Sequence, residues 1–205
     1  MDYYKYKVDV TGYYNFTFSD TKAIGNQWRI TVYDSSLKEI DSYRNNGNTC
    51  TTNTYNFKKG TILYVKVSNY YRAASQEYSL TVNAKKSANW EQENNNTYSK
   101  ATTLKSNTTK YGNLYSYEDV DYYSYTATKT GTVKATLKFD ADKVGDGWKV
   151  AIYDSSKKEM QSVNYITTDK TISFKATKGK KYYVVVTTSS RYSSPTGITY
   201  ALKIK

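Results

Sequence analysis

The chain carries nearly the same pattern twice, and this internal repeat limits what it can fold into more than any other feature. The segment Trp28–Ser36 (WRITVYDSS) recurs as Trp148–Ser156 (WKVAIYDSS), and Asp2–Tyr6 (DYYKY) recurs as Asp121–Tyr125 (DYYSY). Matching residues lie 119 to 122 positions apart. Solenoid units repeat after only about 20–50 residues, so this spacing is that of a whole domain. The sequence therefore predicts two domains of one fold, at residues 1–85 and 86–205.

Apolar and polar residues alternate within each copy. The run Val133–Phe139 (VKATLKF) shows this alternation in the second copy, and Trp28–Tyr33 (WRITVY), another run, shows it in the first. A period of two is typical of a strand with one buried face. The runs end at turn-forming pairs such as Thr-Gly and Lys-Gly. We expect an all-β chain with six to eight strands per copy, folded as two tandem antiparallel β-sandwiches, with a barrel as the alternative.

The core of such domains has to be largely aromatic. Leu, Ile, Val and Phe together supply only 35 of the 205 residues, and the formal net charge is +12. This combination alone would indicate disorder. The 25 Tyr and 3 Trp supply the missing apolar area, because each large ring buries on the order of 150–250 Å².

The rare residue types exclude much catalytic chemistry. The chain has no His, which removes the commonest general base and the commonest metal ligand. The single Cys50 permits no intrachain disulfide and no cysteine metal cage, and we interpret it as a stray thiol. We expect no catalytic residues and no enzyme activity. A glycosidase that uses paired carboxylates is the weakest alternative.

Acidic residues gather where the two copies join. Residues 83–89 are polar and are predicted to be the linker. Two short segments beyond them hold five acidic residues, Glu91, Glu93, Glu118, Asp119 and Asp121. If these segments meet, the carboxylates repel one another unless a cation lies among them. With amide oxygens from Asn95 or Asn96 they form the oxygen donor set that Ca²⁺ prefers. A solvated acidic linker is the alternative.

These residues bring a family resemblance into view. The order is Glu-x-Glu-x-Asn-Asn from Glu91, Asp-x-Asp-Tyr-Tyr from Asp119, Thr-Gly, Trp-x-Val-x-Ile-Tyr-Asp, Lys-Gly-x-x-Tyr-Tyr-Val and a final Tyr-x-Leu-x-Ile. This order resembles the bacterial pre-peptidase C-terminal domain family, which includes the collagen-binding domains of clostridial collagenases. The resemblance covers about residues 90–205 in full, and residues 2–82 without the acidic segment.

The resemblance implies a jelly-roll-like β-sandwich that is appended to a secreted protease or other hydrolase, and hence a longer secreted polypeptide. It also implies a Ca²⁺ site in the second copy, with the ligands Glu91, Glu93, Asn95, Asp119 and Asp121. Asn94 stands where relatives often have Pro. In the first copy Asp2 is present without a Glu-x-Glu partner, so we predict one calcium site, in the second copy only.

The abundance of Tyr predicts a binding surface. Strand parity places some rings on the outward side, and both copies carry Tyr and Arg in the loop before their last strand. Tyrosine offers amphipathic contact area at low entropic cost. The alternative is that strands simply favour Tyr and most of these rings cover sheet surface. The candidate ligand-binding residues are Tyr3, Tyr33, Tyr71, Arg72, Tyr122, Tyr153, Arg191 and Tyr192.

Several function classes remain open at this point. We expect a non-catalytic module that anchors a secreted hydrolase to an insoluble extracellular polymer; the resemblance favours a collagen-like protein, and a polysaccharide is the alternative. A structural or maturation spacer without a polymer ligand also fits. The basic residues are scattered and form no nucleic-acid recognition motif, so no nucleic-acid partner is expected. No apolar run reaches the ~18 residues of a membrane span, so no membrane insertion is expected either.

Overall fold

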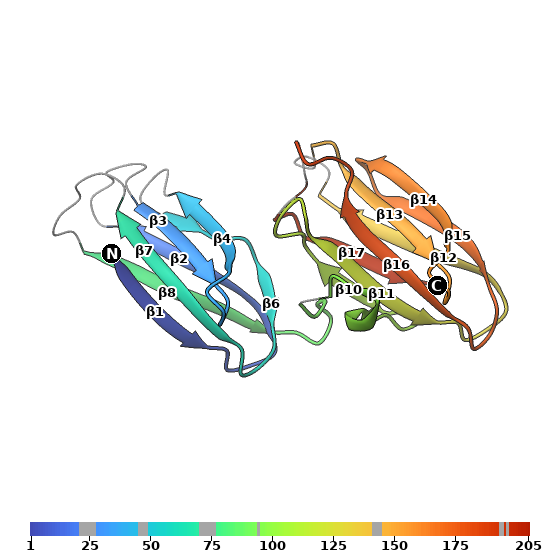
Figure 1. Cartoon of the computed structure of the whole chain (residues 1–205), viewed down its shortest axis with the longest axis horizontal. Helices are drawn as coiled ribbons and strands as arrows, with labels where there is room; N and C mark the ends of the chain where they lie inside the picture. Colours follow the sequence, from blue (N-terminus) through green and yellow to red (C-terminus); the bar gives the residue numbers. More distant parts are fainter. Residues whose placement is uncertain are drawn as a thin grey trace. The chain divides into compact units, whose positions relative to one another are not determined.

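The chain forms two compact units in the computed structural model, Met1–Ala88 and Asn89–Lys205 (Figure 1), named here the first and the second domain. The structure describes residues 1–20, 28–44, 49–69, 77–93, 95–140, 145–192, 195 and 197–205. No helix in this described part has the length and apolarity that a membrane span requires.

The first domain consists of two sheets. Its strands are β1 (Asp2–Lys7), β2 (Gly12–Asp20), β3 (Trp28–Tyr33), β4 (Glu39–Arg44), β5 (Thr49–Thr51), β6 (Tyr55–Phe57), β7 (Ile62–Asn69) and β8 (Tyr78–Lys86). One sheet has the order β1-β7-β3-β4. In the other, β2 pairs with β8 on one side and with β5 and β6 on the other. The predicted linker is wrong at its start, because β8 continues to Lys86, which pairs with Gly12.

The second domain repeats this arrangement and adds to it. Its elements are a 3-10 helix, η1 (Tyr98–Lys100), and the strands β9 (Thr102–Thr103), β10 (Thr109–Gly112), β11 (Val120–Thr126), β12 (Gly131–Phe139), β13 (Trp148–Tyr153), β14 (Glu159–Ile166), β15 (Lys170–Ala176), β16 (Lys181–Thr188) and β17 (Tyr200–Ile204). Its sheets have the orders β14-β13-β16-β11-β9 and β10-β17-β12-β15.

The additional strands of the second domain come from the segment before β11. By sequence repeat and sheet position, β11, β13, β16 and β17 correspond to β1, β3, β7 and β8. Strands β9 and β10 have no counterpart among the described residues of the first domain, and both lie in residues 89–114, named here the lead-in segment. The part of the second domain that the structure describes thus has nine strands, one more than the alternation predicts, and β9 pairs with β11 in parallel.

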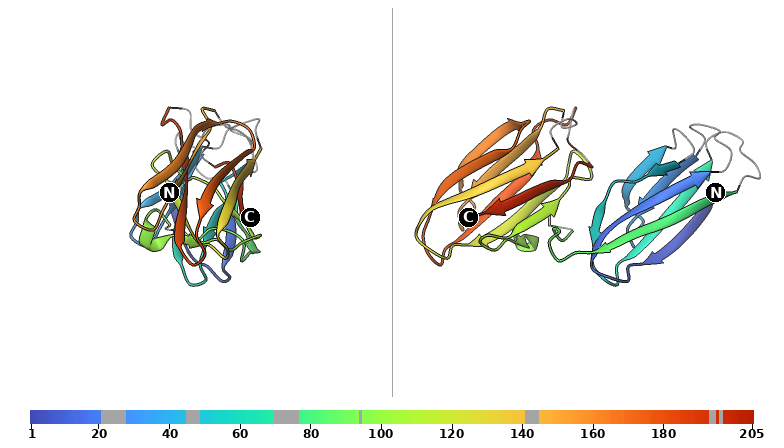
Figure 2. Two further views of the ribbon diagram at one scale, coloured as in Figure 1. Left: turned by 90° about the vertical axis from the view of Figure 1, so that its right-hand side faces the viewer. Right: turned by 180° about the vertical axis from the view of Figure 1, so that it is seen from behind.

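The two sheets of each domain form two facing layers (Figure 2). The expectation of a largely aromatic core is wrong for the second domain, because only six of the 21 buried residues in its core cluster are aromatic. In the second domain a single core cluster unites Tyr123, Trp148 and Val184 of one sheet with Leu137 and Leu202 of the other. Strand β12 shows the predicted alternation of buried and more exposed residues. This two-layer arrangement confirms the prediction of an all-β chain with tandem sandwiches and excludes the barrel.

The repeat extends to the turns. Asp34 and Asp154 each accept hydrogen bonds from the backbone N–H groups two and four residues further on, at 2.8 and 3.0 Å. In both turns the third residue after the aspartate, Leu37 or Lys157, has a positive φ near 60°. Aspartate favours such turns because its side chain can bond the backbone that follows it.

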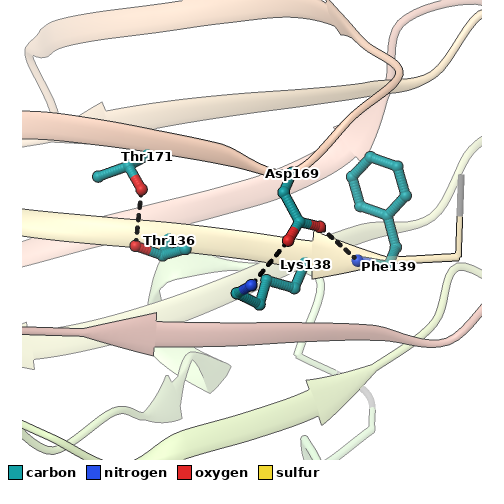
Figure 3. Close-up of polar contacts among 5 residues, drawn as sticks. All are labelled: Thr136, Lys138, Phe139, Asp169 and Thr171. Atoms are coloured by element: carbon teal, nitrogen blue, oxygen red, sulfur yellow. Dashed lines mark hydrogen bonds and ion pairs between the residues drawn. The ribbon is translucent and has the colours of Figure 1, made fainter.

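Strands β12 and β15 show how the solvent-facing side of a sheet is joined (Figure 3). Thr136 and Thr171 share a hydrogen bond of 2.9 Å, and Lys138 Nζ forms an ion pair of 2.8 Å with Asp169. Asp169 also accepts from the N–H of Phe139 at 3.3 Å. The side chains of the ion pair are 66% and 48% exposed, so the pair adds little stability.

We expect neighbouring residues of β12 to differ sharply in their effect on stability. Leu137 is 1% exposed, so Leu137→Ala should lower the free energy of unfolding of the second domain by about 2–5 kcal/mol. Lys138→Ala, one residue on, should change it by less than about 1 kcal/mol. Urea unfolding followed by Trp fluorescence measures both. Equal effects would contradict the assignment of core and surface.

Candidate functional site

The lead-in segment is held against both sheets of the second domain. Its strand β9 pairs with β11 in one sheet, and β10 pairs with β17 in the other. Near its start, the N–H of Glu91 donates to the carbonyl of Tyr111 at 2.8 Å. Leu104 and Leu114 are 1% and 0% exposed and belong to the core cluster. The acidic segment is therefore part of the sandwich and not a solvated linker.

Glu91 lies at the centre of the acidic site. It is 1% exposed. Its Oε1 accepts from the N–H of Asn113 at 2.8 Å. Its Oε2 accepts from the hydroxyls of Tyr123 at 2.9 Å and Tyr200 at 3.1 Å, and from Nδ2 of Asn95 at 3.1 Å. The carboxylate thus ties the lead-in segment to inward-facing residues of β11 and β17.

Asp121 lies beside Glu91 and is 0% exposed. Its Oδ2 accepts from the hydroxyl of Tyr200 at 2.5 Å, and the hydroxyls of Tyr200 and Tyr123 are 2.7 Å apart. One carboxylate oxygen each from Glu91, Glu93 and Asp121 lies within 4.8 Å of the others. Three of the predicted ligands are therefore brought to one point.

Asp119 and Asn95, the other two predicted ligands, take different positions. Asp119 is 1% exposed and accepts from the backbone N–H groups of Tyr115 and Val120 at 3.0 and 2.9 Å. It stands outside the group of three carboxylates. Asn95 is 0% exposed, and its backbone carbonyl accepts from the N–H of Tyr122 at 3.1 Å. Asn95 thereby fixes the lead-in segment to β11.

Burial dominates the electrostatics of this site. Desolvation raises the pKa of Glu91, Glu93 and Asp121, and repulsion by the neighbouring carboxylates raises the pKa of Glu93 and Asp121 further. Burial also raises the pKa of Asp119 to about 7, with the charge of Glu91 adding to the increase. Without a cation, these groups cannot all be ionised at neutral pH at low cost.

The donor atoms fit a hard cation. Among the described residues of the lead-in segment and β11, three buried oxygens have no hydrogen-bond partner, namely Oδ1 of Asn95, Oδ1 of Asn96 and Oδ1 of Asp121. Buried polar atoms without partners are rare and call for an explanation such as an ion. Carboxylate and amide oxygens in this number match the ligands of Ca²⁺. A divalent cation here would satisfy the orphan oxygens and offset the repulsion between the carboxylates.

A second feature is an aromatic cluster around η1, named here the Tyr98 cluster. The ring of Tyr98 makes edge-to-face contacts with Tyr122, Tyr183 and Tyr153, at centroid distances of 4.7, 4.9 and 5.9 Å. Lys157 Nζ lies 5.1 Å from the centroid of the Tyr98 ring. Tyr122 and Tyr153 were predicted from strand parity. Tyr183 could have been found in the same way, whereas nothing in the sequence placed Tyr98 against them.

The corresponding face of the first domain also carries tyrosines. Tyr33 pairs in register with Tyr64, as Tyr153 does with Tyr183. Tyr3 is 58% exposed. Lys66 and Lys5 lie over the rings of Tyr3 and Tyr64, at 5.8 and 6.0 Å from the centroids. Cations near aromatic faces are typical of a mixed aromatic and basic surface.

The loop residues predicted to bind a ligand are only partly described. Arg191 lies over Tyr192, with its guanidinium carbon 5.0 Å from the ring centroid, and donates to the tyrosine hydroxyl at 3.0 Å. Tyr192 is 85% exposed. Tyr71, Arg72 and also Asn94 lie outside the described residues. Cys50 lies in β5 and is free, and burial raises the pKa of its thiol, which makes it a poor nucleophile.

Comparison with known proteins yields structural neighbours only. No protein-family model matches the chain, and no curated protein matches it in sequence. The pre-peptidase C-terminal domain of a collagenase from Bacillus anthracis aligns at 20% identity with a TM-score of 0.41, covering 51% of this chain and 94% of that one. At these values the similarity identifies neither a family nor a ligand.

Two tandem carbohydrate-binding structures align with nearly the whole chain. The tandem CBM51 modules of a family 98 glycoside hydrolase from Streptococcus pneumoniae align at 10% identity and a TM-score of 0.32, covering 98% of this chain and 80% of that one. The tandem CBM22 modules of Paenibacillus barcinonensis Xyn10C align at 9% identity and a TM-score of 0.30, covering 97% and 80%.

The raised pKa values predict an unusual pH dependence in the absence of metal. Between about pH 4 and pH 7 the folded site holds protons that the unfolded chain has released, because the folded pKa values lie above the unfolded ones. The free energy of unfolding of the second domain should therefore fall as the pH rises through this window. We expect a loss of at least about 1.4 kcal/mol, which corresponds to one pKa unit. Urea unfolding in chelator at pH 5 and pH 7.5 measures it.

Asp121→Asn serves as the control for this measurement, because it removes one of the interacting charges. The variant should show a flatter pH profile than the unmodified chain. A second domain that is equally stable, or more stable, at pH 7.5 in chelator would contradict the raised pKa values.

Proposed function

We propose that this chain is a non-catalytic anchoring module whose second domain binds Ca²⁺ and whose aromatic outer faces bind an insoluble extracellular polymer. It would act as part of a longer secreted bacterial polypeptide, such as a protease or another hydrolase. The observation that carries the calcium proposal is the group of buried carboxylates with orphan oxygens around Glu91 and Asp121. The Tyr98 cluster supports the polymer proposal.

The chemistry of the site favours calcium over magnesium. Glu91, Glu93 and Asp121 offer carboxylate oxygens, and Asn95 and Asn96 offer amide oxygens, all from a largely dry environment. Calcium accepts six to eight such oxygens in irregular geometry, whereas magnesium retains several waters in a strict octahedron. Asp119 lies outside this group of three carboxylates and accepts from backbone N–H groups. Of the predicted ligands, its side chain would have to move most to bind the same ion.

Burial also argues against a catalytic role for the carboxylates. A general acid or base must reach the proton that it transfers. Glu91 and Asp121 are 1% and 0% exposed, and their hydrogen bonds lead to tyrosines and backbone of the same domain. A substrate could contact them only if the lead-in segment left the sandwich. The proposal of a binding module rather than a glycosidase rests on this arrangement.

A protein polymer fits the aromatic surface better than a polysaccharide. Sugar rings stack on flat, freely exposed aromatic faces. In the second domain the rings of Tyr122, Tyr153 and Tyr183 are engaged with Tyr98 at angles of 64° to 88°. Such a cluster presents ring edges and hydroxyl groups next to Lys157, which suits hydrogen bonding to the backbone of a fibrous protein. We therefore favour a collagen-like protein, with polysaccharide as the alternative.

Calcium should stabilise the second domain by a specific amount. A ligand that binds only the folded state at 100 times its dissociation constant raises the free energy of unfolding by about 2.7 kcal/mol. We expect an upward shift of the melting temperature of the second domain in calcium relative to chelator, measured by differential scanning calorimetry. Glu91→Gln should abolish the shift. Glu118→Gln, an exposed residue of the same region, makes the same charge change and should leave the shift intact.

Two results would contradict the calcium proposal. One is a melting curve that is the same in calcium and in chelator. The other is a calcium shift that Glu118→Gln reduces as much as Glu91→Gln does.

Binding to insoluble polymers should depend on the Tyr98 cluster. A pull-down on fibrillar collagen, cellulose, chitin and peptidoglycan, with calcium and with chelator, would identify the target. We expect retention on collagen, and a loss of at least about tenfold in affinity for Tyr122→Ala, because aromatic anchors dominate interface energies. Tyr117→Ala removes a 49% exposed ring outside the cluster and should bind normally.

The other outcomes discriminate among the alternatives. Retention on a polysaccharide alone would identify a carbohydrate-binding module. Retention on none of the four polymers would contradict the anchoring role and favour a structural spacer. Melting curves of the variants show whether lost binding reflects lost folding.

A further inference from the structure

Two sheet edges that the second domain closes have no covering strand among the described residues of the first domain. In the second domain, β9 covers the edge of β11 and β10 covers the edge of β17. The corresponding strands of the first domain, β1 and β8, pair within the described residues only with β7 and β2, respectively. Each has a row of backbone N–H and C=O groups on its other side, and such edges are templates for a further strand.

The inward side chains at these edges are correspondingly exposed. Tyr4 is 42% exposed, whereas its counterpart Tyr123 is 0% exposed. Along β8, the inward residues from Tyr78 to Val82 are partly exposed, whereas the inward residues of β17 are all 0% exposed. The difference lies in what covers the strands, because the residue types match between the two domains.

The polar groups that receive Glu91 are present in the first domain as well. The hydroxyls of Tyr4 and Tyr78 are 2.6 Å apart, and Tyr78 donates to Oδ2 of Asp2 at 2.7 Å. Their rings meet at 6.5 Å and 89°, close to the 6.4 Å and 78° of the corresponding pair in the second domain. The described residues of the first domain bring no second carboxylate to this pair. The first domain therefore contains the hydroxyl pair that binds Glu91 in the second domain, but none of its described residues takes the place of Glu91.

A cavity of about 290 Å³ lies at this place. In the second domain the lead-in segment covers the corresponding strands and contributes Leu104 and Leu114 to the core. The cavity of the first domain combines exposed apolar side chains with a tyrosine hydroxyl pair at one side. Its lining includes Tyr4, Tyr6, Phe16, Tyr78, Leu80 and Val82.

We propose that the first domain binds an extended polypeptide segment of a partner along β1 and β8, in the manner that the lead-in segment occupies the second domain. The segment has a carboxylate side chain that accepts a hydrogen bond from the hydroxyl of Tyr4, because the single proton of the Tyr78 hydroxyl is donated to Asp2. It also has an apolar side chain that enters the cavity. Backbone pairing at the open edges supplies affinity, and the pocketed side chains supply specificity. A sugar chain has no peptide backbone whose alternating N–H and C=O groups could pair with these edges along their length.

The second domain also shows that one position of such a segment has room only for glycine. A Cβ atom added at Gly112 would lie 2.5 Å from the hydroxyl of Tyr200 and 2.6 Å from Oε1 of Glu91. Tyr78 occupies the place of Tyr200 in the first domain. The bound segment therefore carries glycine opposite Tyr78.

The probe for the test is a fluorescent synthetic peptide with the sequence of residues 89–114, added to the full chain. Fluorescence anisotropy should show saturable binding, and hydrogen exchange should slow at the backbone amides of β1 and β8. A peptide with Gly112→Val should bind at least about tenfold more weakly, and so should a peptide with Glu91→Gln, because a buried charge-assisted hydrogen bond is lost.

Variants of the chain locate the binding to the groove. Leu80→Lys places a charge in the cavity and should abolish binding, whereas Thr81→Lys places the same charge on the opposite side of β8 and should not. Tyr4→Phe keeps the ring and should weaken binding of the parent peptide by about tenfold, but it should have little effect on the Glu91→Gln peptide. Melting of each variant confirms that the first domain remains folded.

Three results would overturn the proposal. The first is an absence of saturation up to about 1 mM peptide, the range of non-specific contacts. The second is peptide binding that Leu80→Lys leaves unchanged, which would mean that the peptide exchanges into the second domain. The third is dimerisation of the chain without peptide, seen by sedimentation and abolished by Leu80→Lys, which would make a second copy the occupant.

Discussion

The structure of the second domain depends on a small group of buried carboxylates that the sandwich cannot leave unbalanced. Glu91 joins the lead-in segment to Tyr123 of one sheet and Tyr200 of the other, so it links three parts of the fold at once. The same burial that makes these hydrogen bonds strong also penalises the charge. A cation at this point would offset the repulsion between the carboxylates. Because Glu91 contacts both sheets, the ion would then stabilise the contact between them.

The sequence predicts most of the architecture because repeat and alternation are local signals. The match between Trp28–Ser36 and Trp148–Ser156 implies equal folds, and the structure places both segments on corresponding strands and turns. The short strands β9 and β10 were missed, since two to four residues are too few to show a period. The predicted linker starts too early in the chain, at residue 83, because the end of β8 has a polar sequence. Lys85 and Lys86 are both exposed there, so no alternation marks the strand.

The candidate site was predictable in composition but less so in geometry. The family resemblance implied five ligands. The structure gathers Glu91, Glu93 and Asp121, while Asp119 accepts from backbone donors. The positions of the carboxylates along the chain do not show which of their oxygens will accept hydrogen bonds from backbone N–H groups. The position of Tyr98 was likewise beyond prediction, because a residue in a single 3-10 turn has no parity to show which side it faces.

The buried carboxylates and the Tyr98 cluster are joined by only a few residues of the lead-in segment. Asn95 reaches the carboxylates with its side chain and β11 with its carbonyl, and Tyr98 begins η1 three residues later. Any ligand that fixes the amide of Asn95 also limits where the ring of Tyr98 can lie over Tyr122. The order of the aromatic surface is thus tied to the charge balance of the buried site. The first domain has the strands and tyrosines of the same fold, but no segment among its described residues makes that connection, which is why its sheet edges and its hydroxyl pair stay accessible.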